Sequence, residues 1–500
     1  MDLINNLLLG FSVSLTAANL LYALIGCVVG TLVGVLPGVG ALATIAMLLP
    51  ITYGMAPASG LIMLAGIYYG AQYGGSISAI LVNLPGETSS VVTTIDGHQM
   101  AKRGRAGAAL AISALGSFFA GTVATLAIAA FAGPMSNFAF HFGPAENFAL
   151  MTVGLVGAVV ISSGALSKAV AMVILGLLLG LVGTDINTGT SRFASAFPEL
   201  TEGFSVVAVA VGLFGLPEII SNLERGNLPE RILVPFRSLW PSRTEMRRMV
   251  APMVRGTAIG SLLGMLPGGG AALASFASYA CEKKVSRYAP EMGKGAVEGL
   301  AGPESANNAA AQTSFIPLLT LGIPSNAVMA LMMGAMILHS IQPSPLIITK
   351  EPALFWGLIT SMWVGNLILV VLNLPLIGIW VMFLKVPYKY LFGAILVFCS
   401  IGVYSVSSSV FDIYVMVFFG LVGYVLLKLD CEPAPLLLGF VLGPMMEENF
   451  RRSLLISGGD YGVFVGSAIS IVLLAVAVIL AVIVAVPAIR GIRQEAFQEE

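Results

Sequence analysis

Two short polar segments interrupt otherwise apolar sequence, and their side chains and backbone could bind an anion. Each segment contains a proline, which ends one helix and allows another to begin. The N-terminus of the new helix offers unpaired N–H groups and the positive end of the helix dipole, which together favour a carboxylate. A fixed charge at the bilayer centre would instead cost roughly 2.5–3.5 kcal/mol on insertion scales. We therefore expect the anion site to contain Asn83, Gly86, Thr88 and Ser89 from the first segment, and Thr320, Ser325 and Asn326 from the second.

A repeated stretch precedes both polar segments and supplies a second pair of breaks. Residues 30–41 and 260–271 are identical at eight of twelve positions, and both contain Pro-Gly-x-Gly. Inside a membrane, such breaks are tolerated where they line a cavity or are buried in protein. Matching breaks in two halves of a chain point to a transporter binding site. We expect the hairpin tips to close on the anion, or to hold a cation such as Na⁺ through backbone carbonyls. The tips are Pro37, Gly38, Val39 and Gly40, and Pro267, Gly268, Gly269 and Gly270.

Other polar residues near the breaks form a second set of candidates. They are Gln72, Glu87, Asn307, Asn308 and Thr313. Amide and hydroxyl side chains also bond between helices, which contributes about 0.6 kcal/mol on average, so each candidate has a purely structural interpretation as well. Glu87 is a cation ligand, a protonatable carboxylate or a helix N-terminal charge, and Glu304 either faces a cavity or begins an interfacial helix. Asp96 and His98 are interpreted as part of a loop turn.

The composition places these residues in a membrane protein. The chain is 57% hydrophobic and 10% charged, with a mean hydropathy of +0.94, whereas soluble domains carry about 25% charged residues. Apolar runs long enough to cross a bilayer recur from end to end. No basic face exists to bind nucleic acid. The His and Cys residues are scattered, so we expect no metal site, no cofactor and no catalytic constellation.

The distribution of basic residues predicts the topology. The first Lys or Arg is Lys102, and the segment 222–255 is rich in Arg, so both regions are expected in the cytoplasm. The hairpin at 20–50 has no basic residue beside it, whereas the hairpin at 256–281 is followed by basic sequence. The two hairpins should therefore enter from opposite faces, as inverted-topology repeats do. Arg490 and Arg493 place the C-terminus in the cytoplasm.

These observations predict an all-α polytopic membrane protein with about 10–14 membrane segments and re-entrant, broken helical hairpins. The first repeat covers 1–221, with a hairpin at 20–50 and a broken helix at 76–100, and a basic cytoplasmic linker covers 222–255. The second repeat covers 256–450, with a hairpin at 256–281 and a broken helix at 305–341. A last span and a cytoplasmic tail cover 451–500.

Several motifs together resemble one family over essentially the whole chain. The first half contains Gly30–Gly40, Tyr68–Ser76, Asn83–Glu87 and the stretch from Asp96 to Gly107, and the second contains Gly264–Gly270 and Thr320–Pro324. These stretches resemble the large membrane subunit of the tripartite tricarboxylate transporters, the TctA family. The resemblance implies a multi-pass permease of the bacterial inner membrane, and inverted repeats with broken hairpins suggest, by analogy, an elevator mechanism.

The resemblance also implies partners and an energy source. Members of this family work with a small TctB-like membrane subunit and a periplasmic TctC-like solute-binding protein. They take up citrate or related carboxylates by symport with Na⁺ or H⁺, without ATP, and the chain contains no phosphate-binding Gly-x-x-x-x-Gly-Lys-Ser/Thr loop. Two alternatives stay open: a passive channel or pore-forming membrane scaffold, and, less favoured, an intramembrane enzyme. Saturable, gradient-dependent flux would separate a transporter from a channel.

Overall fold

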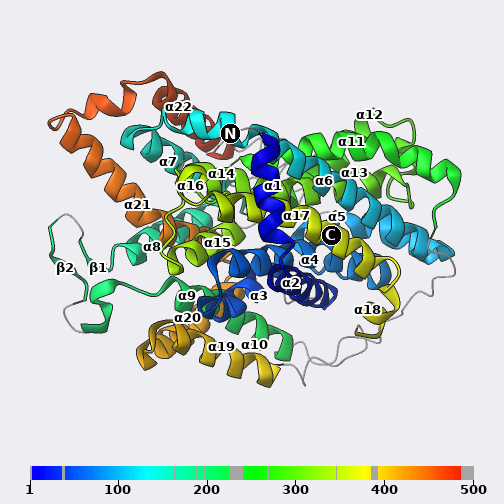
Figure 1. Ribbon diagram of the computed structural model, residues 1–500, viewed down its shortest axis with the longest axis horizontal. Coiled ribbons are helices and arrows are strands. Elements are labelled where there is room, and N and C mark those ends of the chain that lie inside the picture. The colour runs from blue at the N-terminus through cyan, green and yellow to red at the C-terminus, as the bar shows by residue number, and fades with distance from the viewer. Residues whose placement is uncertain are drawn as a thin grey trace.

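The structure is a computed structural model that describes residues 3–36, 40–162, 165–185, 188–194, 198–224, 240–266, 270–344, 346–383 and 392–485. The described residues are almost entirely helical, and one short antiparallel pair, β1 (Gly183–Thr184) and β2 (Ser191–Arg192), extends from one side (Figure 1). The expectation of an all-α membrane protein is confirmed at this level. Four helices in the described part are long and apolar enough to cross a membrane: Ala17–Val35, Ala101–Pro134, Pro352–Asn373 and Val410–Lys428.

The first half of the chain forms helices that include short 3₁₀ and π-helical segments. They are α1 (Leu3–Ser14), α2 (Ala17–Val35), α3 (Ala41–Leu48), η1 (Leu49–Gly54), α4 (Pro57–Val82), η2 (Thr88–Ser90), α5 (Val91–Thr93), η3 (Thr94–His98), η4 (Ala101–Arg105), α6 (Ala106–Ala139), α7 (Pro144–Ile161), α8 (Leu166–Gly180), η5 (Pro198–Glu202), α9 (Val206–Ala210), η6 (Val211–Gly215) and α10 (Leu216–Glu224).

The second half begins with another long hairpin. Its elements are α11 (Arg243–Met265), α12 (Gly270–Val285), η7 (Ala289–Glu291), α13 (Glu298–Thr313), α14 (Phe315–Leu321), α15 (Ala327–Leu338), α16 (Ile347–Lys350), α17 (Pro352–Asn373), α18 (Ile377–Phe383), α19 (Phe392–Ser407), α20 (Val410–Lys428), α21 (Ala434–Ile456), η9 (Tyr461–Val465) and α22 (Ala468–Ala485).

Glycines hold α2 against α4 at backbone distance. A methyl group at Gly30 would lie 2.8 Å from the carbonyl carbon of Ile67, and one at Gly34 would lie 2.8 Å from the amide nitrogen of Gly75. Gly26 meets the carbonyl of Met63 in the same way. Small residues at four-residue spacing allow this close approach between membrane helices.

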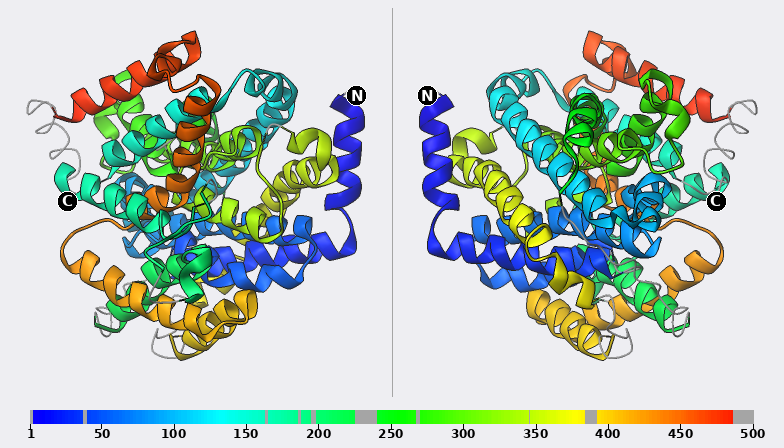
Figure 2. Two further views of the ribbon diagram at one scale, coloured as in Figure 1. Left: turned by 90° about the vertical axis from the view of Figure 1, so that its left-hand side faces the viewer. Right: turned by 90° about the vertical axis from the view of Figure 1, so that its right-hand side faces the viewer.

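The same spacing recurs 230 residues later, where α11 packs on α13. Gly256, Gly260 and Gly264 face the backbone of α13, and a methyl group at Gly260 would lie 2.7 Å from the Cα atom of Ala306. The first arm of the first hairpin thus packs on α4, which ends at the first polar break, and the first arm of the second packs on α13, which is followed by the short α14 before the second break. Figure 1 shows α11, α12 and α13 side by side with α6, on the opposite side of the molecule from α8 and α21. Figure 2 shows α1 standing nearly upright, with the chain then turning into α2 at the base.

The element bounds differ from the expected ones at two places. The first broken helix was expected from residue 76, but α4 continues without interruption to Val82 because its last turns are completely buried among other helices. The helix α11 begins at Arg243, inside the segment 222–255 that was expected to be a linker, with Ser242 as its N-cap. Residues 225–239 of that linker, and residues 486–500 of the expected tail, lie outside the described residues.

Candidate functional site

The two polar breaks share the same backbone geometry. Helix α4 ends at Asn83 in the left-handed conformation, with φ 56°, and α14 ends at Gly322 with φ 69°. A proline follows two residues later in each case, and the residue four positions after Asn83 or Gly322 is the N-cap of the next helix: Glu87 before η2, and Asn326 before α15. The positive φ stops the helix, and the proline prevents it from resuming at once.

The breaks approach each other through helices from opposite halves of the chain. Helix α3, the second arm of the first hairpin, contacts α15. Helix α12, the second arm of the second hairpin, contacts η2. Tyr68 on α4 lies in the electrostatic neighbourhood of Glu87 from the first break and of Ser314 and Asn326 from the second half. The structure thus brings the polar ends of both breaks to one region around Tyr68.

A carboxylate already occupies one of the helix N-termini at this region. Glu87 accepts a hydrogen bond from the backbone N–H of Ala41, the first residue of α3. A methyl group at Gly40 would lie 3.7 Å from the Glu87 carboxylate oxygen. Glu87 is thereby placed where the helix dipole favours negative charge, which agrees with the interpretation as a helix N-terminal charge. The contact places the Glu87 carboxylate beside Gly40 and Ala41, at the described end of the first hairpin tip.

The other predicted residues of the first break differ in exposure. Asn83 and Thr88 are exposed, whereas Gly86 and Ser89 are buried. Gly86 packs against the backbone of both α2 and α4. A methyl group there would collide with the carbonyl of Gly34 on α2 and would lie 2.8 Å from the Cα atom of Gly75 on α4. The Ser89 hydroxyl donates to the side-chain carbonyl of Gln72 at 2.6 Å.

The predicted residues of the second break are mostly engaged by their own backbone. Thr320 donates to the carbonyl of Ile316 at 2.7 Å, and Ser325 donates to the carbonyl of Ser314 at 3.3 Å. Thr313 donates to the carbonyl of Ala309 at 3.0 Å. The Asn326 side-chain oxygen accepts from the N–H of Met329 at 3.0 Å, while its amide nitrogen is buried without a partner among the described residues. Of this set, Asn326 has hydrogen-bonding capacity left for a ligand.

The hairpin tips are described only in part. Pro37, Gly38, Val39, Pro267, Gly268 and Gly269 lie outside the described residues. Gly40 and Gly270 are described, and their φ angles of 57° and 58° match. Each glycine stands at the start of the second arm of its hairpin, where a left-handed angle redirects the chain into α3 or α12.

A buried carboxylate lies between the halves, at a residue to which the sequence gave no single role. Glu304 is 1% exposed in the middle of α13, so it does not begin an interfacial helix. Its carboxylate accepts hydrogen bonds from Ser76 at 2.8 Å, from Ser113 at 3.0 Å and from Thr93. Ser117 lies at 3.5 Å from the same carboxylate. We call Glu304 and these four hydroxyl residues the Glu304 cage.

Two amides follow Glu304 on the same face of α13. Asn308 donates to Ser117 at 2.6 Å and to the Glu304 backbone carbonyl at 3.1 Å. Asn307 is 1% exposed, and neither its amide nitrogen nor its oxygen has a partner among the described residues. The spacing of Glu304, Asn307 and Asn308 at i, i+3 and i+4 was the sequence signal for this cluster. It was obscured because the segment 298–313 is too polar to resemble a buried membrane helix.

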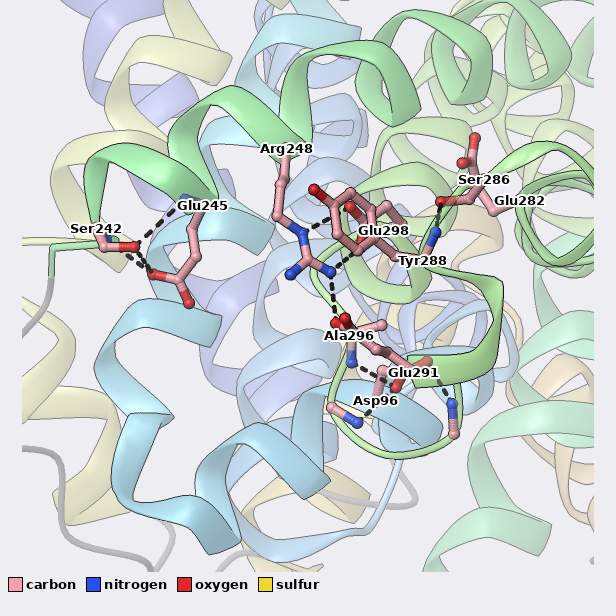
Figure 3. A network of polar contacts seen from close by, with 12 residues as sticks. Asp96, Ser242, Glu245, Arg248, Glu282, Ser286, Tyr288, Glu291, Ala296 and Glu298 are labelled. Carbon is pink, nitrogen blue, oxygen red and sulfur yellow. Dashed lines mark hydrogen bonds and ion pairs between the residues drawn. The ribbon is translucent and has the colours of Figure 1, made fainter.

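A separate network of ion pairs closes the end of the bundle formed by α11, α12 and α13 (Figure 3). Arg248 bonds Glu298 at 2.7 Å and Glu291 at 2.8 Å, and its guanidinium stacks 3.6 Å above the ring of Tyr288. The hydrogen bonds to Glu298, followed by those to Glu291, hold the pKa of Arg248 above its usual value, although burial opposes this. Arg255 bonds the buried Glu282 at 2.6 Å. Glu282, Glu291 and Glu298 therefore each have an arginine partner.

Asp96 and His98 do not form the loop turn expected for them. Both are buried in the π-helical segment η3. The Asp96 carboxylate accepts hydrogen bonds from the backbone N–H groups of Gly293, Gly295 and Ala296 at 2.7–3.1 Å, as Figure 3 shows for the loop before α13. The His98 ring bonds the carbonyl of Ile80 at 2.9 Å. Asp96 thereby joins the first half of the chain to the second, whereas His98 bonds within the first half.

Comparisons with known proteins agree with this architecture. The model of the "Tripartite tricarboxylate transporter TctA family" matches residues 20–438. An uncharacterized 52.8 kDa protein in the TAR-I ttuC' 3' region of Agrobacterium vitis is 57% identical over 500 residues, which is 100% of both chains. An uncharacterized protein in the TAR-II ttuC' 3' region of the same organism is 59% identical over 241 residues, covering 48% of this chain and 100% of the relative. No solved structure matches significantly. The chain belongs to the tripartite tricarboxylate transporter TctA family, a family of transporters rather than enzymes.

Proposed function

We propose that this chain is the large permease subunit of a secondary active uptake system for citrate or a related carboxylate in the bacterial inner membrane. An ion gradient, of Na⁺ or H⁺, drives the uptake. A small TctB-like membrane subunit and a periplasmic TctC-like solute-binding protein complete the system. The family match supports the tripartite assembly, and the two breaks support the transport site.

The observation that carries the proposal is the pairing of two breaks with matched backbone geometry. Asn83 and Gly322 end their helices in the same left-handed conformation, and Glu87 and Asn326 cap the helices that follow. The glycines at matching positions in α2 and α11, which pack on α4 and α13, support the presence of two related repeats. We propose that these repeats are inverted in the membrane. A passive channel would need a continuous lined path, whereas paired breaks fit a site that is exposed alternately to each side.

The proposed carboxylate site lies around Tyr68, with the Asn326 amide, unpaired among the described residues, as a donor. The Ser89 hydroxyl and the N-terminus of α3 would donate to the substrate once they release Gln72 and Glu87. The contact between Glu87 and Ala41 supports this, because it places a carboxylate where one carboxylate of the substrate would bind. A bound substrate carboxylate would then either replace the Glu87 carboxylate at the N-terminus of α3 or lie beside it. A free N–H group and a helix dipole bind the anion without a fixed positive charge in the membrane.

The test is uptake of labelled citrate into vesicles that hold this chain, its small partner and its binding protein. Sodium and proton gradients are imposed separately. Accumulation above equilibrium under one gradient is the expected result. Downhill flux that does not saturate would favour the channel alternative. No flux under either gradient, with all subunits folded and present, would point to another carboxylate, which a ligand screen on the binding protein would identify.

A further inference from the structure

We propose that Glu304 is the proton-binding carboxylate that couples transport to a pH gradient. The inference rests on the proposed function, because it names the coupling ion and the residue that carries it. On entry, a proton from the outer aqueous phase forms an O–H bond with the Glu304 carboxylate. On release, the same bond breaks and the proton passes to water on the cytoplasmic side.

Glu304 has no positively charged partner within the part of the chain that the structure describes. Among the described residues, no Lys or Arg bonds its carboxylate. The other buried glutamates near it are paired, Glu282 with Arg255 and Glu298 with Arg248. An isolated carboxylate in a low-dielectric interior either takes up a proton or requires a compensating cation. The absence of such a partner distinguishes Glu304 from the structural acids of the same bundle.

The chemistry of the Glu304 cage also supports proton binding. Ser76, Thr93, Ser113 and Ser117 all present hydroxyls, which rotate to donate or to accept a hydrogen bond. The cage can therefore satisfy the ionised carboxylate with four donors and the protonated acid with an acceptor, without moving any helix. The hydroxyl oxygens of Ser76 and Ser113 contact the carboxylate directly at 2.8–3.0 Å. Hydroxyls at hydrogen-bond distance from the carboxylate suit a proton that a carboxylate oxygen and a hydroxyl share.

Buried polar groups that have no hydrogen-bond partner among the described residues lie beside the Glu304 cage. The Asn307 amide, one turn along α13, is 1% exposed and has no described partner for either its nitrogen or its oxygen. The Tyr73 hydroxyl is also buried without a described partner, and Tyr73 lies close enough to be affected by the Glu304 charge. Leaving such groups unpaired is unfavourable, because each has lost its hydrogen bonds to water without gaining one in the protein. Their presence is explained if water or a proton path reaches Glu304 from this side.

The titratable groups on the elements that pack around α13 are accounted for. They are Tyr68, Tyr69 and Tyr73 on α4, Asp96 and His98 on η3, Tyr279, Cys281, Glu282, Lys283 and Lys284 on α12, and Arg243, Glu245, Arg247, Arg248 and Arg255 on α11. Asp96 is bonded by Tyr279 and by backbone N–H groups, and Glu282 is bonded by Arg255. His98 bonds a backbone carbonyl. Helix α6 contributes the uncharged Ser113 and Ser117 at this face. Glu304 is therefore the acid in this region whose charge is balanced by hydroxyls alone.

The position of the cage explains how proton binding could be coupled to movement. Ser76, Thr93 and Ser113 belong to α4, α5 and α6 in the first half of the chain, while Glu304 belongs to α13 in the second. Helix α13 contacts α4, α5 and α6, and Figure 1 shows α5, α6 and α13 together on one side of the molecule. An unprotonated Glu304 must keep all its hydroxyl donors. A protonated, uncharged Glu304 can separate from these hydroxyls at a much lower cost in free energy. Protonation would therefore allow α13 to move relative to α4, α5 and α6.

The experiment compares Glu304→Gln with wild type in vesicles that contain all three subunits. The amide mimics the protonated acid in size and charge. Wild type is expected to accumulate labelled citrate under an imposed pH gradient without Na⁺ and to acidify the vesicle interior as it does so. Glu304→Gln is expected to lose accumulation and acidification while still exchanging labelled for unlabelled citrate, because exchange requires no proton release.

Two further variants keep the result interpretable. Glu448→Gln changes an exposed glutamate on α21 and is expected to accumulate citrate as wild type does. Glu304→Asp restores a titratable group and is expected to regain accumulation with a shifted pH profile. The titration of citrate itself is common to all samples, so differences between variants at one pH report on the protein. If Glu304→Gln fails to reach the membrane, the pH profile of Glu304→Asp against that of wild type still tests the proposal.

Three outcomes would overturn the proposal. One is pH-driven accumulation by Glu304→Gln. Another is accumulation by wild type under a Na⁺ gradient alone with no response to a pH gradient, which would leave the proposed transport function intact. The third is a pH profile of Glu304→Asp that superimposes on that of wild type. If wild type transports neither citrate nor any other carboxylate that its binding protein recognises under any gradient, the proposed function itself fails, and this inference fails with it.

Discussion

The glycines that hold α2 against α4 and α11 against α13 allow the effect of an added methyl group on stability to be predicted. In the structure, a methyl group at Gly30 would lie 2.8 Å from the carbonyl carbon of Ile67, and one at Gly260 would lie 2.7 Å from the Cα atom of Ala306. Carbon atoms in contact prefer about 3.5–4.0 Å, so each pair of helices would have to separate by roughly 0.7 Å or more. Overpacking of this kind typically costs 1–3 kcal/mol. We expect Gly30→Ala and Gly260→Ala each to lower the free energy of unfolding by about 2 kcal/mol.

The assay is unfolding of the purified protein in mixed micelles, followed by loss of helical signal with increasing denaturing detergent. Gly133→Ala is the matched control, because a methyl group there has no neighbour within 4 Å. That change should be neutral or stabilising by up to about 1 kcal/mol, since alanine favours helix over glycine. The reasoning would be refuted if Gly30→Ala and Gly260→Ala unfolded at the same point as Gly133→Ala.

Two further changes test the ion pairs and the second break. Arg255→Met should lower the free energy of unfolding by about 3 kcal/mol, because it leaves the fully buried Glu282 without its partner; Lys428→Met, in an exposed pair, should change it little, and equal losses in detergent unfolding would contradict this difference. Asn326→Ala should remove the N-cap of α15 at a cost of about 1 kcal/mol and raise the KM for citrate uptake. An unchanged KM would exclude Asn326 from the substrate site.

The breaks that depend only on neighbouring residues could be predicted from the sequence. The Pro-Gly motifs and the 230-residue repeat predicted breaks, and the structure places left-handed residues at Asn83, Gly322, Gly40 and Gly270. These outcomes depend on the few residues around each break. The exact end of α4 was missed because tertiary burial extends the helix through Val82, and no local signal reports that burial.

The features that depend on distant contacts could not be predicted in the same way. Glu304 meets Ser76 and Ser113 across about 200 residues of sequence, and nothing near Glu304 indicates that those hydroxyls surround it. Asp96 resembled a turn residue, yet its partners are backbone N–H groups of the second half. A single sequence reveals which residues can bond, whereas the packing of α13 against α4 and α6 decides which of them meet.

The central claim is that the two breaks form the transport site, and uptake by a break variant tests it most directly. Pro85→Ala combined with Gly86→Leu would allow the helix to continue and would force the backbone at residue 86 away from Gly34 and Gly75, where a side chain does not fit. Labelled citrate uptake is measured in vesicles with all three subunits and is normalised to the folded permease in the membrane. The account predicts that the variant reaches the membrane in folded form and does not take up citrate. Normal uptake by that variant would contradict the account.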